Sequence, residues 1–365
     1  MRGIVVQTLV ARGVPFEVAL DVANRVRDEL SPGGQVDVGD LEKLIAELLG
    51  DQYPLDPLPT QPERPLPVVR NARGATTPFS KGILAVSLQG AGIDTEQAYQ
   101  VALELEQQLL IEGRTSIDRG ELRDRVAETL EAAHGLRSSE RYLVWRRTRD
   151  AGKPIFILVG GSTGVGKTSI SVELARRLEI SHVIGTDSIR QIMRLMFSED
   201  LMPEIHASTY DAFEALDAVQ TGERVITAFR EQAQKICVGV HALLDRAVEE
   251  NNSILVEGVN LLPSLLDLSR YLNSAHVIQL AVATLDSEAW QDRFETRAAV
   301  ENSRAAIRYL EHFDQIRLIQ DHILQEADLH GLQIIDNTHL DDAAVAATRS
   351  VIAALKKSQS AKVQD

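Results

Sequence analysis

Residues 155–176, IFILVGGSTGVGKTSISVELAR, have the pattern of a buried strand, a glycine-rich turn and an amphipathic helix without a break. The turn contains Gly161, four further residues, then Gly166, Lys167 and Thr168, which is the G-x-x-x-x-G-K-[ST] pattern of a phosphate-binding loop. The apolar run before it and the helical spacing of apolar residues after it are the context that such a loop requires. The stretch therefore predicts an α/β domain that binds nucleotide phosphates, rather than an ordinary glycine-rich turn.

The positions of this loop each have a chemical reason. Glycines let the backbone curl so that successive N–H groups point at phosphate oxygens, and the N-terminal end of the following helix favours the same anion. Lys167 can reach the β- and γ-phosphates, and the Thr168 hydroxyl can hold Mg²⁺. The residues expected to bind ATP are Gly161, Ser162, Thr163, Gly164, Val165, Gly166, Lys167, Thr168 and Ser169.

Short apolar runs alternate with helical stretches from residue 150 onward, which predicts a parallel sheet with helices on both faces. The expected strands are 155–160, 182–187, 253–259, 276–283 and 332–336. In sheets of this kind, ligands bind outside the carboxyl ends of the strands. The residues that follow each strand are therefore the candidates for chemistry.

Asp187, Arg190 and Arg194 follow the second expected strand, in GTDSIRQIMR. The two arginines are four residues apart, so on a helix they share one face and can hold an anionic acceptor. We expect Asp187 to bind the acceptor hydroxyl and take its proton during phosphoryl transfer. The alternative is that Asp187 caps the helix and that the arginines form a solvent-exposed face.

Glu257 follows the third expected strand, and we expect it to hold the metal ion or a metal-bound water and to line the acceptor site. A structural role, in which its carboxylate accepts hydrogen bonds from loop amides, is equally open. Further along, five arginines between residues 290 and 317 predict a lid that closes on the transferring phosphoryl group. Arg297 and Arg304 are assigned catalytic roles in this lid. The alternative is an arginine-rich helical surface.

The N-terminal region repeats itself. Residues 8–30 align with residues 87–109 at a shift of 79, and each copy is followed by a second helical pattern, at 36–50 and 116–131. The duplication predicts small helical units. Between the copies, six prolines in residues 51–69 predict an extended connector.

Residues 68–146 resemble an ATP-cone, a regulatory nucleotide-binding module, through VVRNARGATTPFSKGIL and the helical unit that follows it. This resemblance implies that Arg70, Arg73 and Lys81 contact the phosphates of a regulatory nucleotide. The alternative is that the three cations are solvated charges on a helical domain, and the residues leave both readings open.

Charge and composition restrict the partners. The 365 residues carry a net charge of −15, which argues against a nucleic-acid or membrane-surface partner. Cys237 is the single cysteine, so no intrachain disulfide can form. No apolar run approaches the roughly 18 residues that a membrane span needs. We therefore expect a cytoplasmic protein, and a homo-oligomer through the helical region stays open.

The order and spacing of seven motifs resemble the 2-phosphoglycerate kinase family: GGSTGVGKTS, GTDSIRQIMR, PEIHASTY, ILVEGVNLLP, DRFETRA, RYLEHFDQIR and IIDN. The resemblance covers about 68–340. It implies phosphorylation of 2-phosphoglycerate to 2,3-bisphosphoglycerate, with ATP and Mg²⁺ as cofactors. It also implies that His206 and Tyr210 contact the substrate, although a structural role is at least as open for His206.

Together these patterns predict a P-loop NTPase domain of the α/β class, with a parallel sheet of the nucleoside-monophosphate-kinase type, after an all-helical ATP-cone-like region. The expected domains are a helical half-repeat (1–52), a proline-rich linker (53–67), the ATP-cone-like domain (68–146), the kinase domain (150–345) and a C-terminal helix and tail (346–365). The expected partner is a small phosphorylated hydroxy acid. The rival functions are a kinase for another hydroxylated anion, such as a sugar acid or a phosphorylated polyol, and a nucleotide-sensing regulator that transfers nothing.

Overall fold

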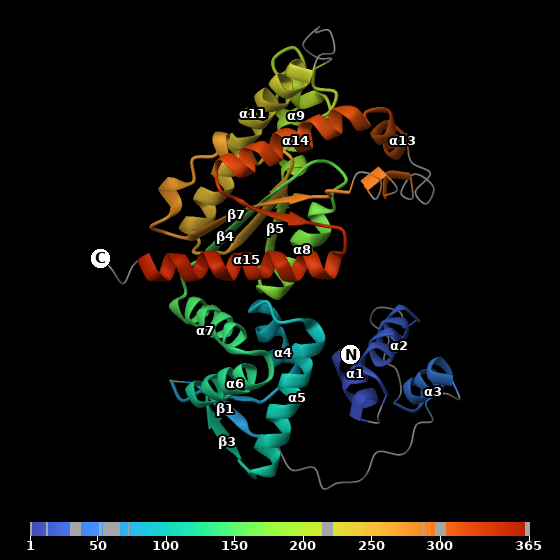
Figure 1. Cartoon of the computed structure of the whole chain (residues 1–365), viewed down its shortest axis with the longest axis vertical. Helices are drawn as coiled ribbons and strands as arrows, with labels where there is room; N and C mark the ends of the chain where they lie inside the picture. Colours follow the sequence, from blue (N-terminus) through green and yellow to red (C-terminus); the bar gives the residue numbers. More distant parts are fainter. Residues whose placement is uncertain are drawn as a thin grey trace. The chain divides into compact units, whose positions relative to one another are not determined.

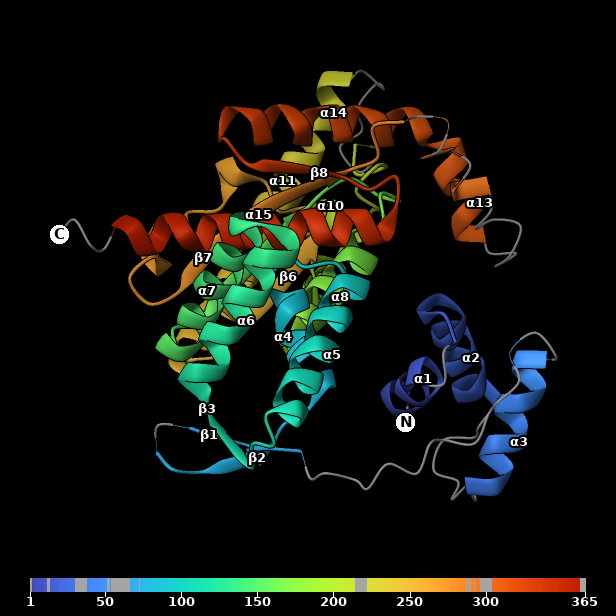
Figure 2. The same cartoon turned by 60° about the horizontal axis from the view of Figure 1, so that its bottom comes forward.

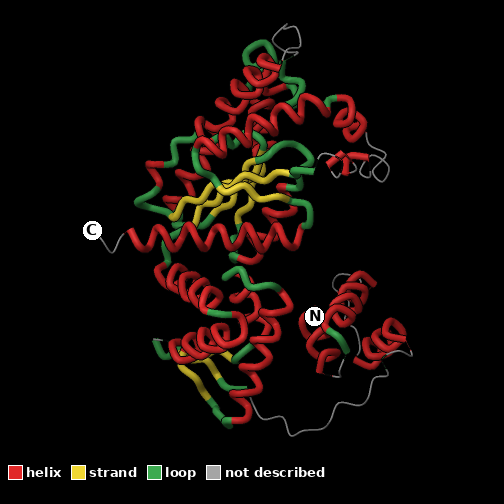
Figure 3. The backbone as a smooth tube through the Cα atoms, viewed as in Figure 1, coloured by secondary structure: helices red, strands yellow, loops and turns green. Residues whose placement is uncertain are grey.

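The computed structural model describes residues 2–11, 14–29, 38–50, 53, 66–71, 73–213, 222–286, 288, 290–291, 293–295 and 304–361. Most of the expected linker, 53–67, lies outside these ranges. The chain divides into two compact units, Met1–Ala85 with Thr95–Asp124, and Val86–Asp94 with Arg125–Asp365. Figure 3 distinguishes the helices, strands and loops of both.

The first unit begins with three helices, α1 (Arg2–Ala11), α2 (Phe16–Glu29) and α3 (Val38–Leu49). Their apolar residues form one buried cluster around Leu9 and Val26. Helix α2 carries its charged residues on its exposed faces, so it has one apolar side to bury. These three helices therefore have a small core of their own.

A small sheet lies in the region that was expected to be all helical. Strand β1 (Val68–Arg70) pairs antiparallel with β2 (Thr76–Pro78) and parallel with β3 (Ser116–Asp118). Asn71 closes the β1–β2 turn, because its Oδ1 accepts hydrogen bonds from the N–H groups of Arg73 and Ala75 at 2.9 and 3.0 Å. Each strand has three residues, too few for an alternating pattern to show in the sequence.

Four helices follow in this part of the chain: α4 (Lys81–Gly90), α5 (Thr95–Ile111), α6 (Arg119–His134) and α7 (Leu136–Ala151). The end of α4 belongs to the second compact unit. There Arg176 donates a hydrogen bond to Oε1 of Gln89 at 2.8 Å, and a Cβ at Gly90 would lie 2.7 Å from Nε1 of Trp145. These contacts explain why the end of α4 is grouped with Trp145 and Arg176 in one compact unit.

Five parallel strands form the sheet of the second unit: β4 (Ile155–Gly160), β5 (His182–Gly185), β6 (Ile254–Gly258), β7 (His276–Ala283) and β8 (Gln333–Asp336). Their order is β5-β6-β4-β7-β8, so the strand before the phosphate-binding loop is central. All of β4 is buried, as a parallel strand covered on both faces should be. The expected α/β class, with a parallel sheet and a P-loop, is confirmed.

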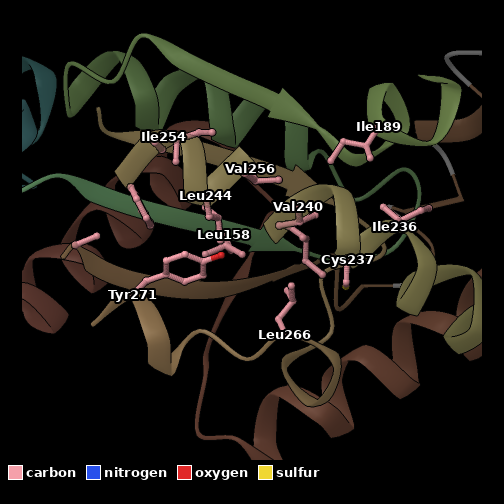
Figure 4. Close-up of a cluster of buried hydrophobic side chains, with 14 residues drawn as sticks. Leu158, Ile189, Ile236, Cys237, Val240, Leu244, Ile254, Val256, Leu266 and Tyr271 are labelled. Atoms are coloured by element: carbon pink, nitrogen blue, oxygen red, sulfur yellow. The ribbon is translucent and has the colours of Figure 1, made fainter. Parts of the chain in front are cut away.

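Helices cover both faces of this sheet (Figures 1 and 2). Helices α8 (Lys167–Arg177) and α15 (Leu340–Ala361) pack on one face, and α11 (Gly222–Glu249) and α14 (Phe313–Leu329) pack on the other. The main core lies between the sheet and α11, where Leu158 and Val256 meet Val240 and Leu244 (Figure 4). Helix α15 is continuous, so the expected domain boundary at 345 falls inside it. The buried residues of α15 recur on one side of the helix on both sides of residue 345, so the helix packs as one continuous element there.

The remaining short elements are α9 (Thr186–Met196), α10 (Pro203–His206), the 3₁₀ turns η3 (Pro263–Leu265) and η4 (Ser269–Tyr271), and α13 (Arg304–Glu311). Among the described residues, no helix combines the length and apolar character needed to cross a bilayer.

Candidate active site

The phosphate-binding loop leaves the central strand β4 and enters α8, and two of its glycines are enclosed by neighbouring segments. A Cβ at Gly161 would stand 2.3 Å from the carbonyl oxygen of Val282 on β7. Gly164 has a φ of 79°, and a Cβ there would lie 2.2 Å from the Phe294 ring. A side chain at either position would push the loop out of place, so packing as well as conformation requires glycine.

Side chains from distant segments hold the backbone of the loop. The Asn337 amide donates from Nδ2 to the carbonyl oxygen of Val165 at 2.8 Å, directly after β8 ends. Ser162 is 1% exposed, and its hydroxyl donates to the carbonyl oxygen of Ile316 at 3.0 Å. The Ser162 side chain therefore fixes the loop to α14, and the loop can offer a phosphate its backbone N–H groups.

Lys167 begins α8 and lies inside the curve of the loop. Its Nζ donates to the carbonyl oxygen of Ser162 at 2.8 Å. Burial lowers the pKa of the Lys167 ammonium, and the carboxylates of Glu257 and Asp187 oppose this shift. The structure thus brings together the cation and the two acids that the sequence placed at three separate strand ends.

Thr168 and Ser169 are exposed in the first turn of α8, on the open side of the loop. The Thr168 hydroxyl donates to Oε1 of Glu257 at 2.9 Å. Across the described residues, no three His, Cys, Asp or Glu side chains cluster as a metal site. A hydroxyl and one carboxylate suit Mg²⁺, which keeps several waters and takes other ligands from substrate phosphates. The donor set therefore fits Mg²⁺ bound with a nucleotide.

Asp187 stands in the first turn of α9, beside the carboxyl end of β5. The N-cap residue of α9 is Gly185, so Asp187 does not cap the helix, and its side chain is 78% exposed. Oδ1 of Asp187 lies 3.2 Å from Nη2 of Arg190, which also donates from Nη1 to the carbonyl oxygen of Ala207 at 2.5 Å. Arg194 is half-buried one turn further along α9. Asp187 thus presents an open carboxylate beside Arg190, with Arg194 further along the same helix.

Residues 203–213, called the acceptor segment below, contain His206 and Tyr210. Nε2 of His206 lies 2.9 Å from the carbonyl oxygen of Phe197, so this ring is engaged with the preceding loop. Tyr210 is 6% exposed, and burial raises the pKa of its hydroxyl, which stays neutral. Both side chains therefore contact neighbouring parts of the chain.

A buried hydrogen-bonded network connects the acceptor segment to the strand ends. Gln232 of α11 accepts hydrogen bonds through Oε1 from Thr209 at 2.9 Å and from Asn260 at 3.2 Å. Its Nε2 donates to the carbonyl oxygen of Ala207 at 3.2 Å. Asn260, which follows β6, accepts from the Thr186 hydroxyl at 3.2 Å. Since buried polar groups need partners, this network specifies how the segments around Asp187 and Glu257 are placed.

The lid region is described in part. Arg297 lies outside the described residues, and Arg304 is the first residue of α13, without a described side chain. Arg293 is described: it donates from Nη1 to the Thr284 hydroxyl at 3.2 Å and from Nη2 to the carbonyl oxygen of Thr338 at 3.1 Å. Arg293 is therefore held against the ends of β7 and β8.

Three residues that sequence reasoning did not select contribute to the site: Asn337, Gln232 and Asp211. Asn337 could have been found, because it directly follows the last expected strand. Asp211 directly follows the PEIHASTY motif, but Glu214 and Asp217 stand close to it in the chain, so the sequence alone does not single it out. Gln232 lies within a long amphipathic helix, and nothing local distinguishes it from a solvent-exposed glutamine.

A loop of the phosphate-binding type at the end of a central parallel strand, with Lys167 and Thr168 near acids at the ends of two other strands, is the arrangement of a P-loop phosphotransferase. Comparison with known proteins extends this assignment. The ATP cone domain family matches residues 67–151.

Curated relatives cover most of the chain. The 2-phosphoglycerate kinase of Methanopyrus kandleri is 37% identical over 266 residues, which are 73% of this chain and 81% of the relative. Those of Pyrococcus horikoshii and Methanocaldococcus jannaschii are 34% and 36% identical over 75% of this chain, with 90% and 88% of each relative covered. The chain therefore belongs to the 2-phosphoglycerate kinase family. A solved shikimate kinase from Bacteroides thetaiotaomicron (19% identical, 56% of this chain and 96% of that one, TM-score 0.26) is too distant to inform the site.

Proposed function

We propose that this phosphotransferase moves the γ-phosphoryl group of ATP to the free hydroxyl of 2-phosphoglycerate and forms 2,3-bisphosphoglycerate. The observation that carries the proposal is the hydrogen bond of 2.9 Å between Thr168 and Glu257, beside Lys167 and facing the end of β5. It supports a nucleotide-and-metal site close to the acid and arginines of α9. The relatives named 2-phosphoglycerate kinase support this acceptor.

In the proposed reaction, Asp187 orients the acceptor hydroxyl in line with the γ-phosphorus. A bond forms between the hydroxyl oxygen and this phosphorus, the bond to the β–γ bridging oxygen breaks, and ADP leaves. The proton of the hydroxyl passes to the Asp187 carboxylate. Lys167 stabilises the charge on the phosphates, and Mg²⁺ held near Thr168 and Glu257 would supply further charge neutralisation. Positioning and electrostatics account for most of the acceleration.

The acceptor itself is a dianionic phosphate with a carboxylate, and we propose that α9 and the acceptor segment bind it. Arg190 is fixed by its bond to Ala207, so its charge is already placed beside Asp187. Arg194 extends the same face. His206 and Tyr210 hold the acceptor segment in place, His206 through its contact with the carbonyl oxygen of Phe197 and Tyr210 through its burial. Arg297 and Arg304 are assigned to the lid that covers the transferring group. Positively charged groups that are held in place before binding lose little freedom when an anion arrives.

An acceptor panel tests the proposed reaction. ADP release is measured with ATP and Mg²⁺ in the presence of 2-phosphoglycerate, 3-phosphoglycerate, glycerate or no acceptor. We expect stimulation by 2-phosphoglycerate alone, because the site offers arginines for two anionic groups and one carboxylate for the hydroxyl. A preparation of a variant without the phosphate-loop lysine controls for contaminating ATPases. Stimulation by another hydroxylated anion, or none at all while ATP still binds, would overturn the proposed acceptor.

We also propose that the ATP-cone module binds a regulatory nucleotide through Arg70 and Arg73, which are exposed at the β1–β2 hairpin. Lys81 was expected to join them, but its Nζ lies 2.6 Å from Oε2 of Glu106 and its side chain is 8% exposed. Lys81 can therefore reach a phosphate only if this buried ion pair opens. The hairpin geometry favours the two arginines as the first contacts of the nucleotide.

Counting nucleotide sites tests this second proposal. Titration calorimetry with a non-hydrolysable ATP analogue is expected to find two sites in the wild type and one in the combined Arg70→Ala, Arg73→Ala variant. Arg123→Ala, which removes a surface arginine of α6 paired with its neighbour Asp124, is the matched control and should keep both. Two sites in the combined variant, or one in the wild type, would contradict the proposal.

A further inference from the structure

The RYLEHF sequence at residues 308–313 has no role in the reaction described above. It forms the corner where α13 ends and α14 begins, at the side of the sheet that carries the site (Figure 2). Four of its side chains contact either the acceptor segment or the cradle of the phosphate-binding loop. The corner is therefore placed to connect the two.

Toward the acceptor segment, the corner makes three contacts. The Tyr309 ring packs on the edge of Tyr210, with centroids 5.7 Å apart and an interplanar angle of 81°. His312 lies against the same ring at 5.2 Å. Arg308 forms an ion pair with Asp211, whose side chain is 5% exposed. Because the Asp211 carboxylate is buried, loss of the Arg308 charge is costly, whereas Arg308 itself is exposed enough to be solvated.

Toward the phosphate-binding loop, the same corner contacts a second set of rings. The Tyr309 ring lies 5.4 Å from Phe294, which is 2% exposed and encloses Gly164. Phe313 packs on Phe294 at 6.0 Å. Tyr309 thus touches a ring of the acceptor segment on one side and, on the other, the ring that closes over the loop.

We propose that Tyr309 is a positioning residue that couples the nucleotide site to the acceptor site. This inference rests on the proposed function, because it assumes that the acceptor segment binds an acceptor. A nucleotide that fixes the loop also fixes Phe294, and Tyr309 transmits this restraint to Tyr210 and the segment around it. Rings in contact at 5.4 and 5.7 Å move together because the packed interior leaves no free volume between them. By linkage, each ligand then raises the affinity for the other by the same factor.

Binding measurements test the coupling. The dissociation constant of a non-hydrolysable ATP analogue with Mg²⁺ is measured with and without 2-phosphoglycerate, for the wild type, Tyr309→Phe and Tyr309→Ala. We expect 2-phosphoglycerate to tighten analogue binding about 5-fold or more in the wild type, within the usual range for coupled sites. Tyr309→Phe keeps the ring and should retain this factor, whereas Tyr309→Ala should lose it. A residue with a merely structural role would lower both affinities or the melting temperature and leave the ratio unchanged.

A second measurement does not depend on which acceptor is correct. Hydrogen exchange of the backbone amides of residues 203–213 is followed with and without the Mg²⁺-bound analogue alone. We expect the analogue to slow exchange there in the wild type and in Tyr309→Phe but not in Tyr309→Ala. Equal protection in Tyr309→Ala would overturn the proposal. Failure of 2-phosphoglycerate to bind the wild type, with the exchange result intact, would overturn the acceptor and leave the coupling in place.

Discussion

Replacement of Lys167 by methionine is expected to lower kcat about 1,000-fold, the size of effect typical when one preorganised charge is removed from a transition state. Methionine has nearly the same length and keeps the apolar contacts of the lysine stem, but it offers no charge to the phosphates. Among the described residues, Nζ of Lys167 donates to one carbonyl oxygen, that of Ser162, so little of the described fold depends on the ammonium. The measurement is steady-state turnover together with circular dichroism and the melting temperature.

Lys153 offers a matched control for this substitution. Its Nζ donates to the carbonyl oxygen of Leu272 at 2.7 Å, just before β4 begins, as Lys167 does just after β4 ends. Lys153→Met therefore removes the same kind of bond at the opposite end of the same strand, away from the loop. We expect it to keep wild-type turnover. If Lys167→Met also turned over at the wild-type rate, the assignment of the phosphate site would be wrong.

The parts of this fold that could be predicted from sequence are those that depend on local signals. The expected strands 155–160 and 276–283 coincide with β4 and β7, because each is a predominantly apolar run followed by glycine or polar residues. The other three differ from the observed strands by one or two residues at an end, as element boundaries commonly do. The phosphate-binding loop was equally accessible, since its glycines, lysine and threonine are adjacent in the chain.

Contacts between distant residues could not be predicted in this way. Asn337 and Val165 are 172 positions apart, and their hydrogen bond depends on the pairing of β8 with β7, which itself pairs with β4. The pairing of Thr209 with Gln232 depends on the fold of the acceptor segment against α11, which no periodicity encodes. The β1–β2–β3 sheet was missed for the opposite reason, because strands of three residues carry too little pattern.

Two kinds of residue therefore build the site. The residues proposed to touch ligands follow the strand ends and carry chemistry that the sequence displays, as Lys167, Thr168 and Glu257 do. Residues that hold the neighbouring segments in place, such as Gln232 and Asn260, are fully buried and bond to each other and to Thr209 and Thr186. A polar network of this kind is costly when one member is lost, because the remaining groups stay buried without partners.

Replacement of Asp187 by asparagine is expected to lower kcat by about 10²- to 10⁴-fold, the contribution of a general base, while the KM for 2-phosphoglycerate changes little. Asparagine has the same shape and can still orient the acceptor hydroxyl, but it cannot take the proton. The Asp187 carboxylate is exposed, and the largely buried Arg190 keeps its hydrogen bond to the carbonyl oxygen of Ala207 and can donate to the asparagine oxygen, so the fold should tolerate the substitution. The measurement is kcat and KM for the acceptor at saturating ATP.

Asp341→Asn separates this chemical effect from the electrostatics of a helix terminus. Asp341 is exposed in the first turn of α15, as Asp187 is in the first turn of α9, so both substitutions remove the same favourable interaction with a helix dipole. We expect Asp341→Asn to leave kcat unchanged. If Asp187→Asn raised KM and lowered kcat to the same degree, Asp187 would act by holding the acceptor. If it changed neither, the proton would have to leave by another route, and the arginines of α9 rather than the acid would define the acceptor site.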